Sequence, residues 1–477
     1  MVCSFDDLPE EIMIEIFKLL DTKSLLEAVK TCKTWKLNID SFIPWKLATI
    51  SCYRADNYDE LCSITRKFPA LELRGDFTTG SRFINFTTFL RQVDADFTGH
   101  VESLTFKSMT IHLKIFASIL RLFPNLEEVK LVNVRTPEDD VGSTLSDIER
   151  PAFAKLRKLI MKMESSSLLL LCFENARITT IDANQQTFDT QAISKFLALQ
   201  TELKNIDFCR LATHQLVLTP MEATNIPFKL KRLALDYRTM NDFNQIMNLL
   251  LLQADCLETL EVGHVPALIY DFIFLGLRKL TTLHIMPGCV KADRLFTVQM
   301  KTNKKVTNLR LYDGAAYGLD SLKVQLTAIQ VMEKLPNVVS LELLIPYNRD
   351  FYDAIVASLR ELKNLTIRVP FDTKLEDLKI PNVEKLRISC YNNKSFSMMK
   401  HGESSQPLVH LKSLTYEGVA NEKFFAAVRR NFPSVENLDL RRKLARVDHT
   451  SVTDIRGVKY RDERFFESSV RFHNQRN

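Results

Sequence analysis

A short hydrophobic phrase, apolar-x-x-Leu-x-apolar, recurs along most of the chain. Examples are FPNLEEVKL at 123–131, CLETLEV at 256–262 and HLKSLTY at 410–416. In a chain that is 45% hydrophobic, three such positions coincide by chance about once in 11 residues, so a single match means little. Leucine, however, holds twelve of fifteen middle positions, and these follow one another about every 26 residues. The pattern predicts a short strand around each middle residue: Leu71, Leu104, Val129, Leu159, Ile181, Ile206, Leu233, Leu260, Leu283, Leu309, Leu341, Leu365, Leu386, Leu414 and Leu438.

The segments between these phrases have a helical rhythm, with apolar residues three and four positions apart. The clearest are 112–123, 242–253, 322–335, 351–362 and 421–432. Several end at a proline, namely Pro69, Pro124, Pro336 or Pro433, which cannot continue a helix and favours extended geometry before it. Each unit is therefore predicted to be a helix, a break and a strand.

A strand–helix unit of this length resembles the leucine-rich repeat, over roughly residues 65–440. The resemblance implies an α/β fold: an irregular solenoid in the form of a horseshoe, with parallel strands on the concave side and helices on the convex side. The family template places Asn or Cys five residues after the middle leucine. None of the fifteen positions here has either, as Val134 and Glu164 illustrate. The alternative is an ordinary α/β protein with a coincidental rhythm.

The first fifty residues lie outside the repeat and read as three short helices. The first covers 7–20, the second 24–35, and a third element carries the apolar residues of 42–47. Helices this short are marginal as an independent unit. They also hold both tryptophans of the chain, Trp35 and Trp45. Aromatic anchors on a small helical unit suggest a surface for a partner.

The order of residues in this segment resembles the F-box: LPEEI at 8–12, Ile16-Phe17, Leu20-Asp21, Ser24-Leu25-Leu26 and CKTW at 32–35. One departure is Thr31, where the family more often has Val. The resemblance implies docking onto the Skp adaptor of a cullin-based ubiquitin ligase. The alternative is an N-terminal cap for the solenoid. The contacts expected with the adaptor are Leu8, Pro9, Ile12, Ile16, Phe17, Leu20, Leu25, Leu26, Cys32 and Trp35.

The two resemblances together predict three parts: a three-helix F-box over 1–50, about 14–15 irregular repeats over 51–440, and a basic tail or cap over 441–477. This layout implies a substrate receptor, which would hold a protein target near a ubiquitin-charged enzyme on a cullin–RING scaffold. An alternative is a scaffold whose F-box recruits the adaptor without a cullin. A third, an enzyme with a cryptic site, lacks support in the residues.

Residues that follow each strand leucine are expected to face outward and meet the target. Arginines among them suggest a basic stripe for an acidic or phosphorylated partner, whereas the simpler interpretation is a solvated charged face. Whether recognition needs phosphorylation or a small molecule is left open. The target-binding residues predicted on this basis are Arg310, Tyr312, Arg368, Arg387 and Arg441.

Composition narrows the remaining possibilities. Net charge is 64 − 58 = +6, too mild to argue for nucleic acid without clustering. The acidic start, MVCSFDDLPEE, is unlike a secretory leader, and no apolar run approaches the roughly 20 residues of a membrane span. Nine scattered cysteines without a CxxC pair indicate a reduced, intracellular protein, cytoplasmic or nuclear. We expect no catalytic residues, no metal and no cofactor, because no phosphate loop, HExxH or GxSxG pattern occurs.

Overall fold

A computed structural model of the chain divides it into two compact units, residues 1–229 with 467–477, and residues 230–466. Each unit is described by itself. The residues described are 8–20, 22–42, 49–52, 69–75, 98–137, 150–163, 165–183, 189–208, 226–236, 243–263, 267–285, 302–312, 328–344, 357–369, 383–390, 410–417, 425, 428, 430, 432–440, 458–460 and 469–470.

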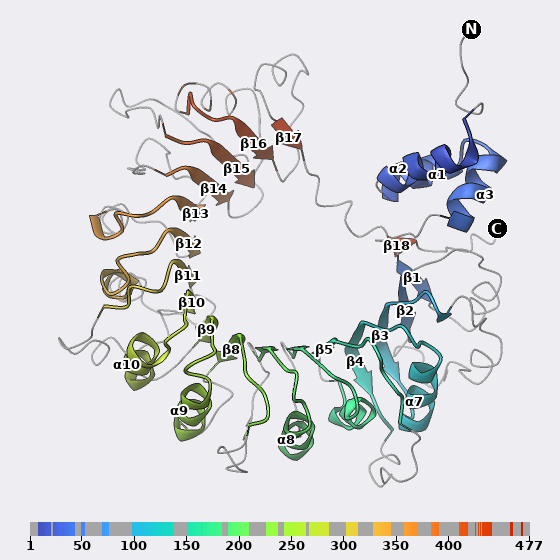
Figure 1. Ribbon diagram of the computed structural model, residues 1–477, viewed down its shortest axis with the longest axis horizontal. Coiled ribbons are helices and arrows are strands. Elements are labelled where there is room, and N and C mark those ends of the chain that lie inside the picture. The colour runs from blue at the N-terminus through green and yellow to red at the C-terminus, as the bar shows by residue number, and fades with distance from the viewer. Residues whose placement is uncertain are drawn as a thin grey trace. The chain divides into compact units, whose positions relative to one another are not determined.

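The first unit begins with three helices and continues as consecutive parallel strands. The helices are α1 (Glu10–Leu19), α2 (Thr22–Val29) and α3 (Lys33–Phe42). The strands are β1 (Thr49–Cys52), β2 (Ala70–Arg74), β3 (Ser103–Thr110), β4 (Glu128–Arg135), β5 (Lys158–Lys162), β6 (Thr180–Asp182) and β7 (Asn205–Asp207). Helices α7 (Leu113–Arg121) and α8 (Thr190–Ala198) and the 3-10 helix η4 (Ser167–Phe173) lie on one side of these strands (Figure 1).

The second unit repeats the arrangement with parallel strands β8 to β17. They are β8 (Arg232–Asp236), β9 (Thr259–Gly263), β10 (Thr282–Ile285), β11 (Asn308–Tyr312), β12 (Ser340–Leu344), β13 (Asn364–Val369), β14 (Lys385–Cys390), β15 (Ser413–Glu417), β16 (Asn437–Leu440) and β17 (Val458–Tyr460). Helices α9 (Phe243–Leu252) and α10 (Ala267–Gly276) again lie on one side of the strands (Figure 1).

All fifteen predicted middle residues lie in strands, and within each unit they stand in one register. Leu260 is paired with Leu283 and Leu283 with Leu309, and the other pairings of these residues follow the same rule. Every one of the fifteen is at most 4% exposed. Alternation along a strand places these residues on the face toward the helices and their neighbours on the opposite, open face. The predicted fold class, N-terminal helices followed by stacked parallel strands of a repeat, is confirmed.

One backbone carbonyl per repeat links it to the next. At thirteen of the fifteen middle residues, the oxygen two residues earlier accepts two successive N–H groups from the following repeat. The Glu258 oxygen, for example, accepts from Thr281 and Thr282 at 3.0 and 3.1 Å, and the Thr281 oxygen from Thr307 and Asn308 at 2.9 and 3.1 Å. Because these bonds use only the backbone, the side chains at this position are free to vary.

Predicted helices are confirmed where the structure describes them. Segment 112–123 forms α7, 242–253 forms α9, and residues 328–333 of segment 322–335 are helical. Helix α10 gave no periodic signal, because ALIYDFIFLG is apolar on every side. Among the described helices none combines the length and the apolar character needed to cross a membrane.

Buried polar side chains fill backbone gaps between repeats. The Gln253 Oε1 atom accepts the Leu230 N–H at 2.7 Å, and the Gln200 Oε1 atom accepts the Ile178 N–H at 3.2 Å. Both glutamines are 1% exposed. At Val134, one of the positions where the template has Asn or Cys, the Ser165 hydroxyl accepts the N–H at 3.2 Å. In these repeats, buried backbone N–H groups are therefore bonded by different side chains, Gln253, Gln200 and Ser165, and not by one recurring asparagine.

Three strands were not predicted from the sequence. β1 is parallel to β2, with Thr49 opposite Ala70, so the repeat sheet begins at Thr49, inside the segment predicted as F-box. In the tail, β17 continues the stack beside β16, and β18 (Ser469–Val470) is parallel to β1. The tail thus adds a strand after the last predicted repeat.

We expect Gln253→Met to open the repeat around β8 locally. The change leaves the buried Leu230 N–H without an acceptor, at a cost of about 1–3 kcal/mol. Hydrogen exchange measured on peptides covering 226–236 should quicken accordingly. The neighbouring change Leu252→Gln, at a side chain 42% exposed, is the control and should leave protection intact. Equal protection in both variants would contradict the anchoring role of Gln253.

Candidate functional site

Helix α1 starts at Pro9, whose carbonyl accepts the N–H groups of Ile12 and Met13 at 3.0 and 3.1 Å. Proline stands just before the first turn, where its missing N–H is not needed. Glu10 and Glu11 occupy the first turn, where carboxylates favour the positive end of the helix. The LPEE sequence thus fixes the start of the helix.

The helix predicted over 24–35 is in fact two helices, which corrects the earlier assignment. α2 ends at Val29, and the Thr31 hydroxyl donates to the Ala28 carbonyl at 2.7 Å. α3 then begins after Cys32, whose sulfur accepts the Trp35 N–H at 3.4 Å and so caps the new helix. Apolar spacing did not reveal the break, because the rhythm of the two helices is nearly continuous. Of the third predicted element, residues 43–47 lie outside the described residues.

The three helices enclose a small core of their own. Phe17 is 1% exposed, and its ring meets that of Trp35 edge-to-face, with centroids 5.4 Å apart. Met13, Leu25 and Ile39 are buried as well. Phe17 and Leu25 were predicted to contact the adaptor, but their side chains are not accessible here. They hold the helices together instead.

A second face of α1, roughly 110° around the helix from Met13 and Phe17, carries an exposed apolar stripe, defined as Ile12, Ile16 and Leu19. A spacing of four and then three residues places them on one helix face. Ile12 is 49% and Leu19 86% exposed, and Ile16 is half-buried. Leu19 was not among the predicted contacts, although its place seven residues after Ile12 could have identified it.

The other predicted adaptor contacts are accessible to different degrees. Pro9 and Cys32 are exposed, whereas Leu8, Leu20 and Trp35 are half-buried. The Leu26 side chain lies outside the described residues. The accessible members of the predicted set therefore cluster at α1 and at the start of α3.

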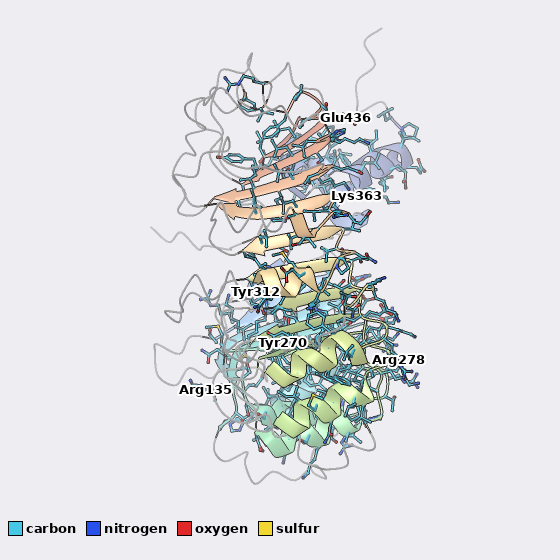
Figure 2. The ribbon with its side chains drawn as sticks, turned by 90° about the vertical axis from the view of Figure 1, so that its left-hand side faces the viewer. Arg135, Tyr270, Arg278, Tyr312, Lys363 and Glu436 are labelled. Carbon is cyan, nitrogen blue, oxygen red and sulfur yellow. The ribbon has the colours of Figure 1, made fainter. Side chains whose placement is uncertain are left out.

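On the open sheet face, two predicted target-binding arginines are paired with acids on neighbouring strands. Arg310 on β11 lies 3.3 Å from Glu342 on β12, and the Arg387 Nε atom donates to Glu417 at 2.7 Å. Tyr312 is half-buried at the end of β11, on the opposite side from Arg278 and Lys363, which precede their strands (Figure 2). The expected basic stripe is thus a face of alternating sign, at least at these arginines.

Two predicted target-binding residues are not described in this way. Arg368 lies in β13, but its side chain is outside the described residues, and so is all of Arg441. The stripe therefore stays a prediction at these two positions.

Glu261 lies at the centre of another group on this face. It is 3.3 Å from the His284 Nδ1 atom and 3.6 Å from Arg232, at 18% side-chain exposure. Burial alone raises the pKa of Glu261. The hydrogen bond and charge of His284, with Arg232 and Arg310, outweigh it and bring the pKa below its usual value. Glu261 is thus the ionised centre of this group of charged side chains on the open face.

The described residues bear on two kinds of catalytic group, metal ligands and reactive thiols. No group of three or more His, Cys, Asp or Glu side chains gathers as metal ligands within them. Burial, with a smaller contribution from Glu174, raises the pKa of the Cys172 thiol to about 12, so this thiol stays protonated.

Comparison with known proteins agrees with the geometry at the N-terminus. Residues 5–47 match the model of the F-box domain. No curated protein matches the chain. A crystal structure of the Rad7 and Elc1 complex in yeast is similar at 11% identity over 94% of this chain and 92% of that chain, with a TM-score of 0.29. Values this low support no conclusion about shared partners.

Residues 5–47 are an F-box domain. α1, α2 and α3 all lie inside the match, and the contact of buried Phe17 with Trp35 is part of its core. F-box domains bind adaptors of the Skp type, so the exposed stripe of α1 belongs to a domain with an adaptor-binding role.

Phe17→Ala should unfold the three helices while leaving the repeats intact. Removing a fully buried aromatic ring costs about 3–5 kcal/mol, which a unit of this size does not retain. Tryptophan fluorescence reports the change, because both tryptophans belong to this segment. Leu19→Ala, an exposed site on the same helix, serves as the control and should keep the native spectrum. A native spectrum for Phe17→Ala would show that the ring is not structural.

The ionised Glu261 should make the second unit sensitive to acid. A lowered folded-state pKa means that Glu261 stabilises the fold above its unfolded pKa of about 4.3. This contribution disappears as the pH falls through the still lower folded pKa. Thermal unfolding should therefore separate wild type from Glu261→Gln at pH 7, with wild type more stable, and the gap should close below about pH 4. A gap independent of pH would rule out the ionised role.

Proposed function

We propose that this chain is the substrate-recognition subunit of an SCF-type ubiquitin ligase. Its F-box binds the Skp adaptor, and its repeats, which we infer to be of the leucine-rich type, hold a protein target. The observation that carries the proposal is the division of α1 into two apolar faces. One is buried with Trp35, and the other, the stripe of Ile12, Ile16 and Leu19, is open to solvent.

An exposed stripe of this kind costs free energy in water and becomes favourable when a partner covers it. Full burial of one aliphatic side chain contributes about 1.5–3 kcal/mol. Leu19 is 86% exposed and so has nearly all of this to gain. The accessible Pro9 and Cys32 and the half-buried Leu8, Leu20 and Trp35 extend the proposed adaptor surface.

The chain itself would form no covalent bond with the target. F-box proteins are in general adaptor or receptor subunits, and here the adaptor links the chain to a cullin–RING scaffold. Holding the target near a ubiquitin-charged enzyme turns a bimolecular transfer into an effectively intramolecular one. The open sheet face is the surface proposed for the target.

Replacing the stripe should abolish adaptor binding without unfolding the domain. For Ile12→Ser with Leu19→Ser, we expect the Kd of the full chain for purified Skp adaptor to rise at least about a hundredfold, since two apolar side chains lose their burial. The circular dichroism spectrum should not change. Calorimetric titration measures the affinity.

The matched control replaces two exposed leucines on α9, Leu251→Ser with Leu252→Ser, at 52% and 42% exposure. It should bind the adaptor like wild type. Unchanged affinity in the stripe variant would refute the adaptor surface. If wild type binds the adaptor but never co-purifies a cullin, the chain is a scaffold and not a ligase receptor.

A further inference from the structure

Strands β3, β4 and β5 carry an alternating set of lysines and apolar residues on their open face. We call this set the lysine checkerboard and define it as Lys107, Lys130, Val132, Ile160 and Lys162. The register places Lys107 opposite Val132, Val132 opposite Lys162, and Lys130 opposite Ile160. Each apolar residue therefore has a lysine beside it on the neighbouring strand and another two residues along its own.

Two of these lysines have no acidic partner among the described residues. Lys162 lies 3.2 Å from Asp182 on β6, and nearby Lys158 lies 2.5 Å from Glu128. Lys107 and Lys130 make no ion pair or side-chain hydrogen bond with any described residue. Strand spacing puts their Cα atoms about 8 Å apart, on the diagonal of adjacent strands. Among the other charges on this face, Glu128 stands two residues before Lys130 on β4 and is paired with Lys158. Arg74 lies beside Lys107, and Glu72 is on the same strand as Arg74.

The two apolar residues of the checkerboard, Val132 and Ile160, lie between the lysines at the base of this surface. Val132 and Ile160 are 8% and 7% exposed, although alternation places them on the face away from the helices. This is the behaviour of short side chains among longer neighbours, whose aliphatic stems cover them and whose charged ends stay in water. A partner that displaces those stems finds apolar contact and positive charge together.

In the other unit, by contrast, several cations on the open face are paired with acidic side chains. There Arg232 and His284 share Glu261, Arg310 meets Glu342, and Arg387 meets Glu417. Cations paired in this way offer little to an incoming anion. Lys107 and Lys130, which no described residue pairs, keep a local positive potential that an acidic partner would complement.

We propose that the lysine checkerboard binds a segment of the target protein in which Asp and Glu alternate with aliphatic side chains. This inference rests on the proposed function, whose target surface it specifies. Lysine acts as a point charge toward carboxylate and phosphate alike. We choose Asp and Glu because they can alternate with aliphatic residues in one segment, as lysine alternates with Val132 and Ile160 here. These two apolar residues add the contact that separates such a segment from a merely acidic one.

The test selects random twelve-residue peptides displayed on phage against the full-length chain, and measures the winners by fluorescence anisotropy. We expect them to be enriched in Asp and Glu with interspersed aliphatic residues. Their affinity should fall at least about tenfold for Lys107→Glu with Lys130→Glu, and should weaken with added salt. The control Lys114→Glu with Lys155→Glu makes the same charge change in the same unit at exposed sites off the open face, and should stay within about twofold of wild type.

Two results would overturn the inference: selected peptides without an acidic excess, or equal binding by the checkerboard variant. If the charge reversal perturbs folding, Lys107→Gln with Lys130→Gln must reproduce the loss with a native spectrum. Adaptor affinity is measured on the same proteins. The checkerboard variant should bind the adaptor normally, and the α1 stripe variant should still bind peptides, so failure at one surface is separable from failure at the other.

Discussion

Thirteen of the fifteen predicted repeats hold the next one through a single shared acceptor. A carbonyl oxygen receives two successive N–H groups from the next repeat, and this pair of bonds fixes the register of the strand that follows. With the register fixed, one buried leucine falls beside another from strand to strand, and the core grows by nearest-neighbour contact. Residues between the leucines then necessarily face the open side. The surface proposed for the target is thus a by-product of how the core is assembled.

The F-box domain uses one short helix, α1, both for its own core and for an exposed apolar surface. Helix α1 must be apolar inward, to pack Phe17 against Trp35, and apolar outward, to offer Ile12 and Leu19. A ten-residue helix with both faces apolar is a poor surface helix by itself. Its two faces make sense together if one completes the domain and the other awaits a partner. Substitution of a buried residue such as Phe17 should therefore unfold the domain, whereas substitution of an exposed residue such as Leu19 should weaken adaptor binding and leave the domain folded.

Much of the fold was readable from the sequence, because leucine periodicity survives irregular loops. Fifteen middle residues predicted fifteen strands, since only a buried position demands leucine so regularly. Helix α10 could not be found by periodicity, because an element apolar all round has none. The break at Cys32 depends on a sulfur that caps a helix, which spacing does not encode. Phe17 and Leu25 looked like contact residues because composition cannot tell which side of a short helix its own neighbours cover. The pairing of Arg310 with Glu342 likewise needed the register between strands 32 residues apart, which only the fold supplies.

The shared carbonyl also explains where a proline can stand ahead of a strand. Each step needs two donors in a row, immediately before the middle leucine, and proline has no N–H to give. Pro124, Pro336 and Pro433 instead all stand five residues before a middle residue, outside that donor pair. Pro69 does precede Leu71 by two residues, but there its carbonyl serves as the first acceptor, with its missing N–H on the side of β1. Three of the sixteen prolines therefore stand just ahead of a strand without removing a donor from the pair that joins it to the previous repeat.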